Sequence, residues 1–237
     1  MFAVKGLNRA PVLFAVLIRM RRWIWTDMAD MENSSGLSLA EAAQGVIAMA
    51  HFAGARHWVP ATSGNFSVRM DGNLAALTAT GADKAHLTEG EVIAAEIVGP
   101  KHPRASAEAP LHLARYASTP MIGAIAHIHS MPATLLSRRH EKAGVFRLEG
   151  WELLKAFSGV TTHETMLEVP IVPNDQDTDR LAAVVEERMA AGGPYAPGYL
   201  IAGHGLYVWG ATAKDAIRHM EAFDFLLTAA LHEEDAR

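Results

Sequence analysis

The sequence predicts an α/β fold in which a central mixed β-sheet is covered by helices on both faces. Half of the 237 residues are hydrophobic, which is enough to bury the core of a single domain of this length. Short apolar runs typical of strands alternate along the chain with stretches typical of helices, and this order places helices on both faces of a sheet. The sequence contains no internal repeat, low-complexity tract or interdomain linker.

The first 35 residues differ from the rest of the chain. An apolar run over residues 10–18 is flanked by lysine and arginine, which imitates a signal peptide. The run is too short to span a bilayer, and the arginines and tryptophans that follow it are not a small-residue cleavage site. We therefore predict that residues 1–35 are an extension outside the core and that residues 36–237 form one domain. The alternative is a basic helix that lies on a membrane surface.

The expected elements begin with a helix that has a clear start signal. Ser38-Leu39-Ala40-Glu41 is a capping box, in which the serine side chain accepts from a backbone amide three residues on and the glutamate reaches back. Asp71-Gly72-Asn73 marks the turn of a hairpin. The expected helices cover residues 39–55, 105–116, 130–138, 179–191 and 214–232, and the expected strands cover residues 66–70, 74–78, 121–129, 169–173, 199–202 and 206–209.

Charge and cysteine content narrow the class of function. The formal net charge is -5 and the pI is about 6.2, which argues against a nucleic-acid-binding surface. No basic stripe with interleaved aromatic residues is present in the sequence. Partners should therefore be small molecules or other copies of the chain. The absence of cysteine excludes a disulfide framework and fits the reducing cytoplasm, where we expect the protein to act.

Two histidines lie side by side at the end of an expected strand. His127 and His129 end an apolar run, and residues two apart share one face of a strand. His204, between two glycines after another apolar run, is the candidate third ligand. Three neutral imidazoles with an open fourth position are typical of a catalytic zinc, although Fe, Mn or Co could occupy them. The competing interpretation is chance spacing among 12 histidines.

Turns of small residues at the ends of the expected hairpin are candidates for binding an anion. Ser63-Gly64-Asn65 and Thr78-Ala79-Thr80-Gly81 could direct their backbone amides toward one anion. Lys84 and Ser106 could add a charge and a hydroxyl group. Ordinary turn chemistry is the competing interpretation, because serine, glycine and asparagine favour turns. Neither turn matches a nucleotide-binding phosphate loop or a dinucleotide fingerprint.

Two glutamates are candidates for proton transfer. Glu108 lies near the start of an expected helix, where a carboxylate either stabilises the helix dipole or is positioned for chemistry. Glu152 lies among the large apolar residues Trp151, Leu153 and Leu154. A glutamate in such company either faces solvent or is held partly desolvated, with a raised pKa. Both carboxylates are therefore candidates for acid–base catalysis.

Four motifs taken together resemble the class II aldolase/adducin-head family. They are residues 60–67, Ser106-Ala107-Glu108, His127-Ile128-His129-Ser130 and residues 203–210. The resemblance covers residues 39–230. Within the family, further segments are most similar to its dehydratases. These segments are residues 150–155, Pro173-Asn174-Asp175-Gln176-Asp177 and Tyr207-Val208-Trp209.

The resemblance implies a three-layer α/β/α sandwich with a central mixed sheet and one Zn²⁺ ion per subunit. The zinc would be carried by His127, His129 and His204, and the substrate phosphate would be held by Gly64, Asn65, Thr80, Gly81 and Ser106. Tetramers are usual in the family, with active sites near subunit contacts. Departures from the family pattern weaken the phosphate assignment more than the metal assignment. They are Ile128, Ala105 and Ala109-Pro110.

The resemblance also indicates which carboxylate is the acid–base catalyst. Glu108 matches the catalytic glutamate of the family's sugar-phosphate aldolases, whereas Glu152 matches the one proposed for its dehydratases. We prefer Glu152 for the acid–base role, because some dehydratases lack the glutamate that Glu108 matches. The predicted function is a metal-dependent hydro-lyase that acts on a sugar phosphate. The alternatives are a class II sugar-phosphate aldolase, a pentulose-phosphate 4-epimerase, or a noncatalytic adducin-like module, which would not need three histidines.

Overall fold

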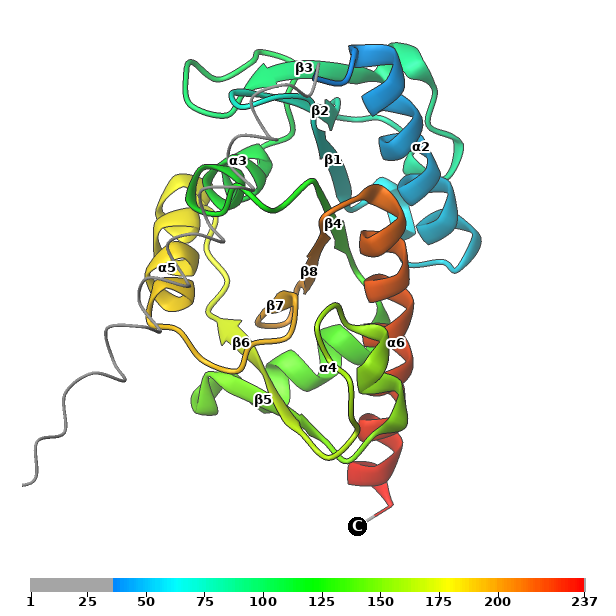
Figure 1. Ribbon diagram of the computed structural model, residues 1–237, viewed down its shortest axis with the longest axis vertical. Helices are drawn as coiled ribbons and strands as arrows, with labels where there is room; N and C mark the ends of the chain where they lie inside the picture. Colours follow the sequence, from blue (N-terminus) through cyan, green and yellow to red (C-terminus); the bar gives the residue numbers. More distant parts are fainter. Residues whose placement is uncertain (1–35, 237) are drawn as a thin grey trace, which may run out of the picture. The chain divides into compact units, whose positions relative to one another are not determined.

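A computed structural model describes residues 36–236 of the chain (Figure 1). The predicted N-terminal extension, residues 1–35, lies outside the described residues and stays a prediction. Within residues 36–236, no helix is both long enough and apolar enough to cross a membrane. These residues form a β-sheet and the helices that pack on it.

Eight strands form one sheet. They are β1 (Asn65–Arg69), β2 (Leu74–Thr78), β3 (Val92–Glu96), β4 (Ala124–Ile128), β5 (Val145–Glu149), β6 (Met166–Val172), β7 (Gly198–Ile201) and β8 (Gly205–Gly210). Their order across the sheet is β3-β2-β1-β4-β8-β7-β6-β5. Strands β6 and β7 pair in parallel, whereas the other neighbouring strands pair antiparallel. The predicted mixed sheet is confirmed, and β4 and β8 lie at its centre.

Helices cover both faces of the sheet, which gives the three layers. Helices α2 (Leu39–Ala55), α4 (Met131–Arg139) and α6 (Ala213–Asp235) lie on one face, and α3 (Ala109–Ser118) and α5 (Thr178–Ala190) lie on the other (Figure 1). Successive side chains of β4 point to opposite faces. Ala126 and Ile128 therefore pack in the core with α2, α4 and α6, whereas Ile125 packs in the core with α3 and α5.

The helix starts follow the capping chemistry of the sequence. The backbone amide of Glu41 donates to Ser38 Oγ at 3.3 Å, and the amide of Ser38 donates to Glu41 Oε2 at 2.9 Å, so the predicted capping box is formed. Helix α3 begins at Ala109 rather than at residue 105. Pro110 lies in its first turn, where a backbone N–H has no partner within the helix, so the N–H that proline lacks costs nothing. Residue 108 is consequently the N-cap of the helix.

The predicted strands differ from the observed ones in their bounds and in their number, and β6 begins at Met166 rather than at residue 169. Strand β4 begins after residues 121–123 and ends at Ile128, so His129 lies one residue beyond it. Strands β3 and β5 are additional to the predicted elements. The sheet therefore extends further at both edges than the sequence pattern indicated, while each predicted central strand is present with shifted bounds.

A glycine allows β8 to pass close to the end of β4. A Cβ atom added to Gly205 would lie 2.3 Å from the carbonyl oxygen of Ile128 and 3.1 Å from Cε1 of His127. The carbonyl oxygen belongs to a paired backbone and cannot move aside. The second glycine of the Gly203-His204-Gly205 motif is therefore required by packing, because only a residue without Cβ fits there.

Gly205→Ala should destabilise the fold, because the added methyl group overlaps the backbone of β4. We expect the free energy of unfolding in denaturant titrations to fall by about 1–3 kcal/mol. Gly90→Ala is the matched control, since nothing lies within 4 Å of a Cβ atom at that position. The control should change stability by less than about 0.5 kcal/mol. Equal stabilities for the two variants would contradict the close approach of the strands.

Candidate metal centre

The structure brings the three candidate histidines together. His127 is the fourth residue of β4, His129 follows the strand on the same face, and His204 lies in the turn between β7 and β8. Nε2 of His127 lies 2.9 Å from Nε2 of His129 and 3.3 Å from Nε2 of His204. All three ligand atoms lie within 4.8 Å of one another. His127 and His129, two residues apart, therefore lie side by side near His204, as the sequence predicted.

The turn that carries His204 is held in place by α4. The amide of His204 donates to the carbonyl oxygen of Ile201 at 3.0 Å, which closes the turn. Thr134 Oγ1 donates to the carbonyl oxygen of His204 at 3.1 Å, and Ser137 Oγ accepts from the amide of Gly203 at 3.0 Å. Because both side chains come from one helix, the imidazole of His204 is presented by a supported backbone rather than by a free loop.

The protonation of His127 follows from its contacts. Its Nδ1 lies 3.1 Å from the carbonyl oxygen of Leu206, which can only accept, so Nδ1 carries the proton. The ring is fully buried, and burial lowers the pKa of His127 well below its ordinary value. A neutral ring protonated at Nδ1 has its lone pair on Nε2, the atom that faces the other two histidines. That atom is thus free to serve as a metal ligand.

The other two histidines also fit a shared cation. Burial lowers the pKa of His129 to about 4, so this ring is neutral at pH 7. Among residues 36–236, the buried Nδ1 of His204 has no hydrogen-bond partner. Three close ring nitrogens cannot all donate to one another, whereas a divalent cation between them would satisfy all three lone pairs. The donor set therefore suits a divalent metal ion.

Glu108 adds a carboxylate to this cluster. Its Oε1 lies 3.2 Å from Nε2 of His204 and 3.6 Å from Nε2 of His127. Its Oε2 accepts from Nδ2 of Asn65 at 2.6 Å. Burial acts to raise the pKa of Glu108, but His127, His204 and the Asn65 amide outweigh it, so the pKa is lowered and the carboxylate is ionised at pH 7. The cluster thus combines neutral nitrogen ligands with one negative charge.

Within a single chain, Glu152 lies in an exposed position, unlike Glu108, which lies beside the histidine cluster. It begins the 3₁₀-helix η5 (Glu152–Ala156), which buries Leu154 and leaves 69% of the Glu152 side chain exposed. Its carboxylate pairs with Lys155 and lies 3.3 Å from Nδ1 of His163. Lys155 lowers the pKa of Glu152, so a carboxylate with a raised pKa is not observed here. In the described part of the chain, no hydrogen bond or ion pair joins Glu152 to the histidine cluster.

The candidate phosphate-binding turns meet at one edge of the site. The pairing of β1 with β2 and a bridge between Ala79 and Ala105 bring the three turns together. The amide of Thr80 already donates to the carbonyl oxygen of Arg104 at 2.9 Å. Ser106 Oγ accepts from the amide of Glu108 at 3.3 Å, and its own O–H remains a donor. Gly64, Asn65, Thr80, Gly81 and Ser106 are therefore neighbours, although the amide of Thr80 is already in use.

The turn before β1 has a strained backbone that is packed against the histidine strand. Ala61, Thr62 and Gly64 have φ angles of 51°, 62° and 77°, which are costly for the first two residues. A Cβ atom at Gly64 would lie 2.7 Å from the carbonyl oxygen of His127. Lys84 Nζ donates to the carbonyl oxygen of Thr62 at 2.7 Å. Lys84 is buried and its pKa is lowered by that burial, so it fixes the turn and places positive charge beside it.

Two residues near the cluster were missed by the sequence interpretation. The ring of Tyr207 stacks on that of His127, with a centroid distance of 4.1 Å and an interplanar angle of 14°. His112 bonds to Asn65 at 2.5 Å. The spacing of four between Glu108 and His112 could have revealed the second residue, because residues four apart share a helix face. The pairing of His127 with Tyr207 is long-range and left no local signal.

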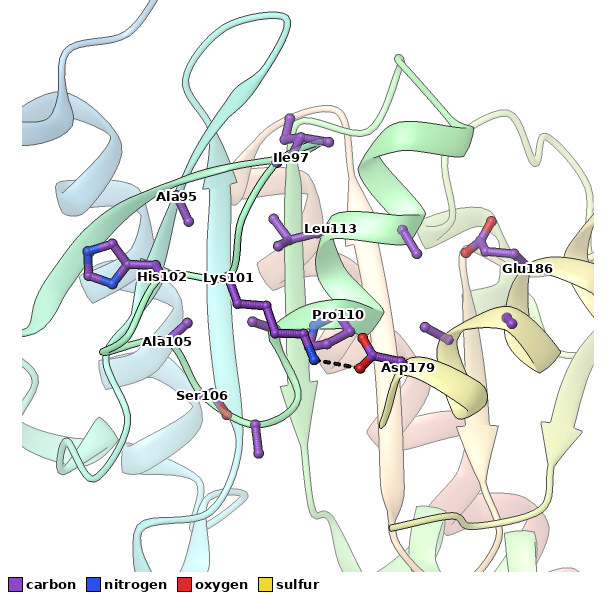
Figure 2. A pocket seen from close by; sticks show the side chains of 16 residues that line it. Ala95, Ile97, Lys101, His102, Ala105, Ser106, Pro110, Leu113, Asp179 and Glu186 are labelled. Carbon is purple, nitrogen blue, oxygen red and sulfur yellow. Dashed lines mark hydrogen bonds and ion pairs between the residues drawn. The ribbon is translucent and has the colours of Figure 1, made fainter. Parts of the chain in front are cut away.

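A separate cleft of about 530 Å³ lies between α3, α5 and the loop of residues 97–107 (Figure 2). Ile97, Leu113 and several alanines form its apolar walls, and Lys101 pairs with Asp179 across one end. Ser106 lies in its wall, whereas its lining within residues 36–236 includes neither Glu108 nor any histidine of the cluster. The cleft therefore borders the candidate phosphate turns without being part of the metal centre.

Comparison with known proteins identifies a family and similar relatives. Residues 44–231 match a family model described as Class II Aldolase and Adducin N-terminal domain. A methylthioribulose-1-phosphate dehydratase of Parvibaculum lavamentivorans is 74% identical over 201 residues, which cover 85% of this chain and 98% of that protein. A protein of the same name from a Bradyrhizobium species is 48% identical over 198 residues, which cover 82% of this chain and 92% of that protein.

Solved structures share the fold. The L-fuculose-1-phosphate aldolase from Thermus thermophilus superposes with a TM-score of 0.66 at 24% identity, covering 81% of this chain and 93% of that one. A second L-fuculose 1-phosphate aldolase gives a TM-score of 0.68 at 20% identity, covering 86% of this chain and 90% of that one. At these identities the likeness concerns the fold alone.

The purified protein should carry about one divalent metal ion per chain. His129→Ala and His127→Ala should each remove most of it, because two remaining imidazoles are too few to hold the ion against water. Elemental analysis of the folded variants measures the loss. His86→Ala is the control, since His86 is exposed and pairs with Asp83 away from the cluster. Full metal content in the double variant of His127 and His129 would rule out this site.

Proposed function

The chain belongs to the class II aldolase and adducin N-terminal domain family, and we propose that it is a lyase that removes water from 5-methylthioribulose 1-phosphate. The product would be 2,3-diketo-5-methylthiopentyl 1-phosphate, in methionine salvage. The observation that carries the proposal is the 74% identity to a dehydratase of that substrate, over 98% of the relative's length. The histidine cluster and the adjacent carboxylate support it, since the family is metal-dependent.

Zn²⁺ is the proposed ion, one per subunit. His127, His129 and His204 would hold it, because three neutral imidazoles are a ligand set typical of catalytic zinc. When bound, the ion supplies Lewis-acid polarisation of the substrate's C2 carbonyl group, which acidifies the hydrogen on C3. The hydrogen bond from Nδ1 of His127 to Leu206 keeps that ring in the required tautomer.

The phosphate of the substrate would bind at the three turns. The backbone amides at 64–65 and of Gly81, together with the hydroxyls of Thr80 and Ser106, provide donors without a bulky side chain. Ser106 lies just before the N-terminus of α3, where the helix dipole favours negative charge. Lys84 adds positive charge nearby. Holding the phosphate on C1 fixes the positions of C2 and C3 relative to the histidine cluster.

The reaction needs one group to take a proton and one to give a proton. We assign the first role to Glu108, which is ionised beside the histidines and would accept the proton from C3. Glu152 would then donate a proton to the hydroxyl oxygen on C4, which leaves as water. The resulting enol tautomerises to the 2,3-diketone. This division gives each candidate carboxylate a separate step.

Glu152 must come from a neighbouring copy to take part. Its carboxylate is exposed within its own chain, and the apolar side chains of Leu153 and Phe225, which are 36% and 57% exposed, line the same surface hollow. Exposed apolar residues beside a charged group are typical of subunit contacts. We therefore propose a cytoplasmic homotetramer in which Glu152 completes the site of the adjacent subunit.

A substrate comparison tests the proposed reaction. The zinc-loaded protein should convert 5-methylthioribulose 1-phosphate to the diketone, with a kcat/KM at least about 100-fold above that for fuculose, rhamnulose or ribulose phosphates. Chromatography of the products separates dehydration from carbon–carbon cleavage and from epimerisation. Efficient cleavage of fuculose 1-phosphate without dehydration would instead identify an aldolase, and no turnover of any substrate would favour a noncatalytic module.

Two glutamine variants test the assignment of the carboxylates. Glu108→Gln and Glu152→Gln should each lower kcat by roughly 10²- to 10⁴-fold with little change in metal content, because each removes one proton-transfer group. If Glu152 acts on the neighbouring subunit, mixed tetramers of the two variants contain sites with both glutamates. Such mixtures should recover about one quarter of wild-type activity, the fraction of correct neighbour pairs in a symmetric ring. No recovery would show that Glu152 does not act across subunits.

A further inference from the structure

A chain of hydrogen bonds leads from the core of α3 to the carboxylate of Glu108. Tyr116 OH lies 2.9 Å from Ser67 Oγ, and Ser67 Oγ lies 2.7 Å from Nδ1 of His112. Nε2 of His112 lies 2.5 Å from Oδ1 of Asn65, whose Nδ2 donates to Glu108. The members of this hydrogen-bonded chain other than Glu108 are at most 4% exposed, so water does not compete for their polar atoms. Each bond therefore constrains the next one.

One arrangement of protons satisfies the whole chain. The carboxylate of Glu108 accepts, so Asn65 turns its NH₂ group toward it and its carbonyl oxygen toward His112. Nε2 of His112 must then carry the proton and donate to that oxygen. Burial lowers the pKa of His112 to about 4, so the ring is neutral and its Nδ1 accepts from the hydroxyl of Ser67. Every donor in the chain consequently points toward Glu108.

The N–H group of His112 decides which way the Asn65 amide faces. An asparagine amide has nearly the same shape after a flip, so packing alone does not select one orientation. The flipped amide would set its oxygen against the carboxylate of Glu108 and its NH₂ group against the N–H of His112. Two repulsive contacts would replace two buried hydrogen bonds, and buried unpaired polar groups are costly.

We propose that His112 is a positioning residue, which fixes the orientation of Asn65 and, through Asn65, the direction of the Glu108 carboxylate. The inference rests on one part of the proposed function, which is the acid–base role of Glu108. Asn65 holds Oε2 of Glu108, which leaves Oε1 facing the cluster, 3.2 Å from Nε2 of His204. A carboxylate held at one oxygen presents the other in a fixed direction, as proton transfer to a set position requires.

Two substitutions at His112 separate positioning from packing. Glutamine places an amide N–H as many bonds from Cβ as Nε2 of histidine, so His112→Gln can still donate to Asn65. Asparagine places its amide at the position of Nδ1, so His112→Asn can contact Ser67 but does not reach Asn65. We expect kcat of His112→Asn to fall by roughly 10- to 100-fold, and kcat of His112→Gln to stay at least about tenfold above it.

The metal content should change by less than about threefold in both variants, because the histidine cluster is untouched. The Michaelis constant should also change by less than about threefold, because the loss of the His112 contact reorients the side chain of Asn65 and leaves its backbone amide in place. A purely structural role would instead lower the melting temperatures while leaving kcat of the folded variants equal. Equal kcat values for the two variants, or a kcat of His112→Gln below that of His112→Asn, would overturn the proposal.

Neutron crystallography of the full-length wild-type protein gives a test that needs no variant. After exchange into D₂O, a deuteron should appear on Nε2 of His112 and none on Nδ1. A deuteron on Nδ1, or on both nitrogens, would overturn the inference even if both His112 variants failed to fold. A protein that shows the expected deuteron but does not dehydrate 5-methylthioribulose 1-phosphate would refute the proposed function and still support the hydrogen-bonded orientation of Glu108.

Discussion

The antiparallel pairing of β4 with both β1 and β8 is the constraint on which the candidate site depends. This register sets His127 between Asn65 on one neighbouring strand and Tyr207 on the other. Asn65 holds Glu108, Tyr207 stacks on the His127 ring, and the carbonyl oxygen of Leu206 fixes the tautomer of that ring. A slip of one residue would turn each side chain of β4 to the opposite face of the sheet. The contacts that specify the fold therefore also specify the site.

Burial gives the site its electrostatic character. An exposed imidazole titrates near pH 6.5 and would repel a cation once protonated. His127 and His129 are kept neutral because the central strand is covered by helices on both faces, which lowers their pKa values. The carboxylate of Glu108 remains charged in the same place, since its pKa is lowered in spite of its burial. Neutral ligands beside one fixed negative charge suit both a divalent cation and a proton acceptor.

Periodicity and turn chemistry were enough to predict the centre of the molecule from its sequence. The spacing of His127 and His129 is a local property of a strand, and the structure places both beside His204. The exposure of Glu152 was not predictable, because it depends on how a short 3₁₀-helix turns against the core and buries Leu154 instead. The role of His112 was missed because its partner Asn65 lies 47 residues away. Edge strands β3 and β5 were not recognised, although each has five residues, as many as β4.

The three histidines of the candidate metal centre and the adjoining candidate phosphate turns are positioned by neighbouring strands of one sheet. Anomalous scattering at the zinc edge measures the position of the metal ion directly. The crystals should contain the zinc-loaded protein with an unreactive substrate analogue that carries a phosphate group. We predict a zinc peak about 2.0–2.1 Å from Nε2 of His127, His129 and His204. The analogue's phosphate should lie against Gly64, Thr80 and Ser106. Zinc bound elsewhere, or a phosphate remote from these turns, would contradict this arrangement.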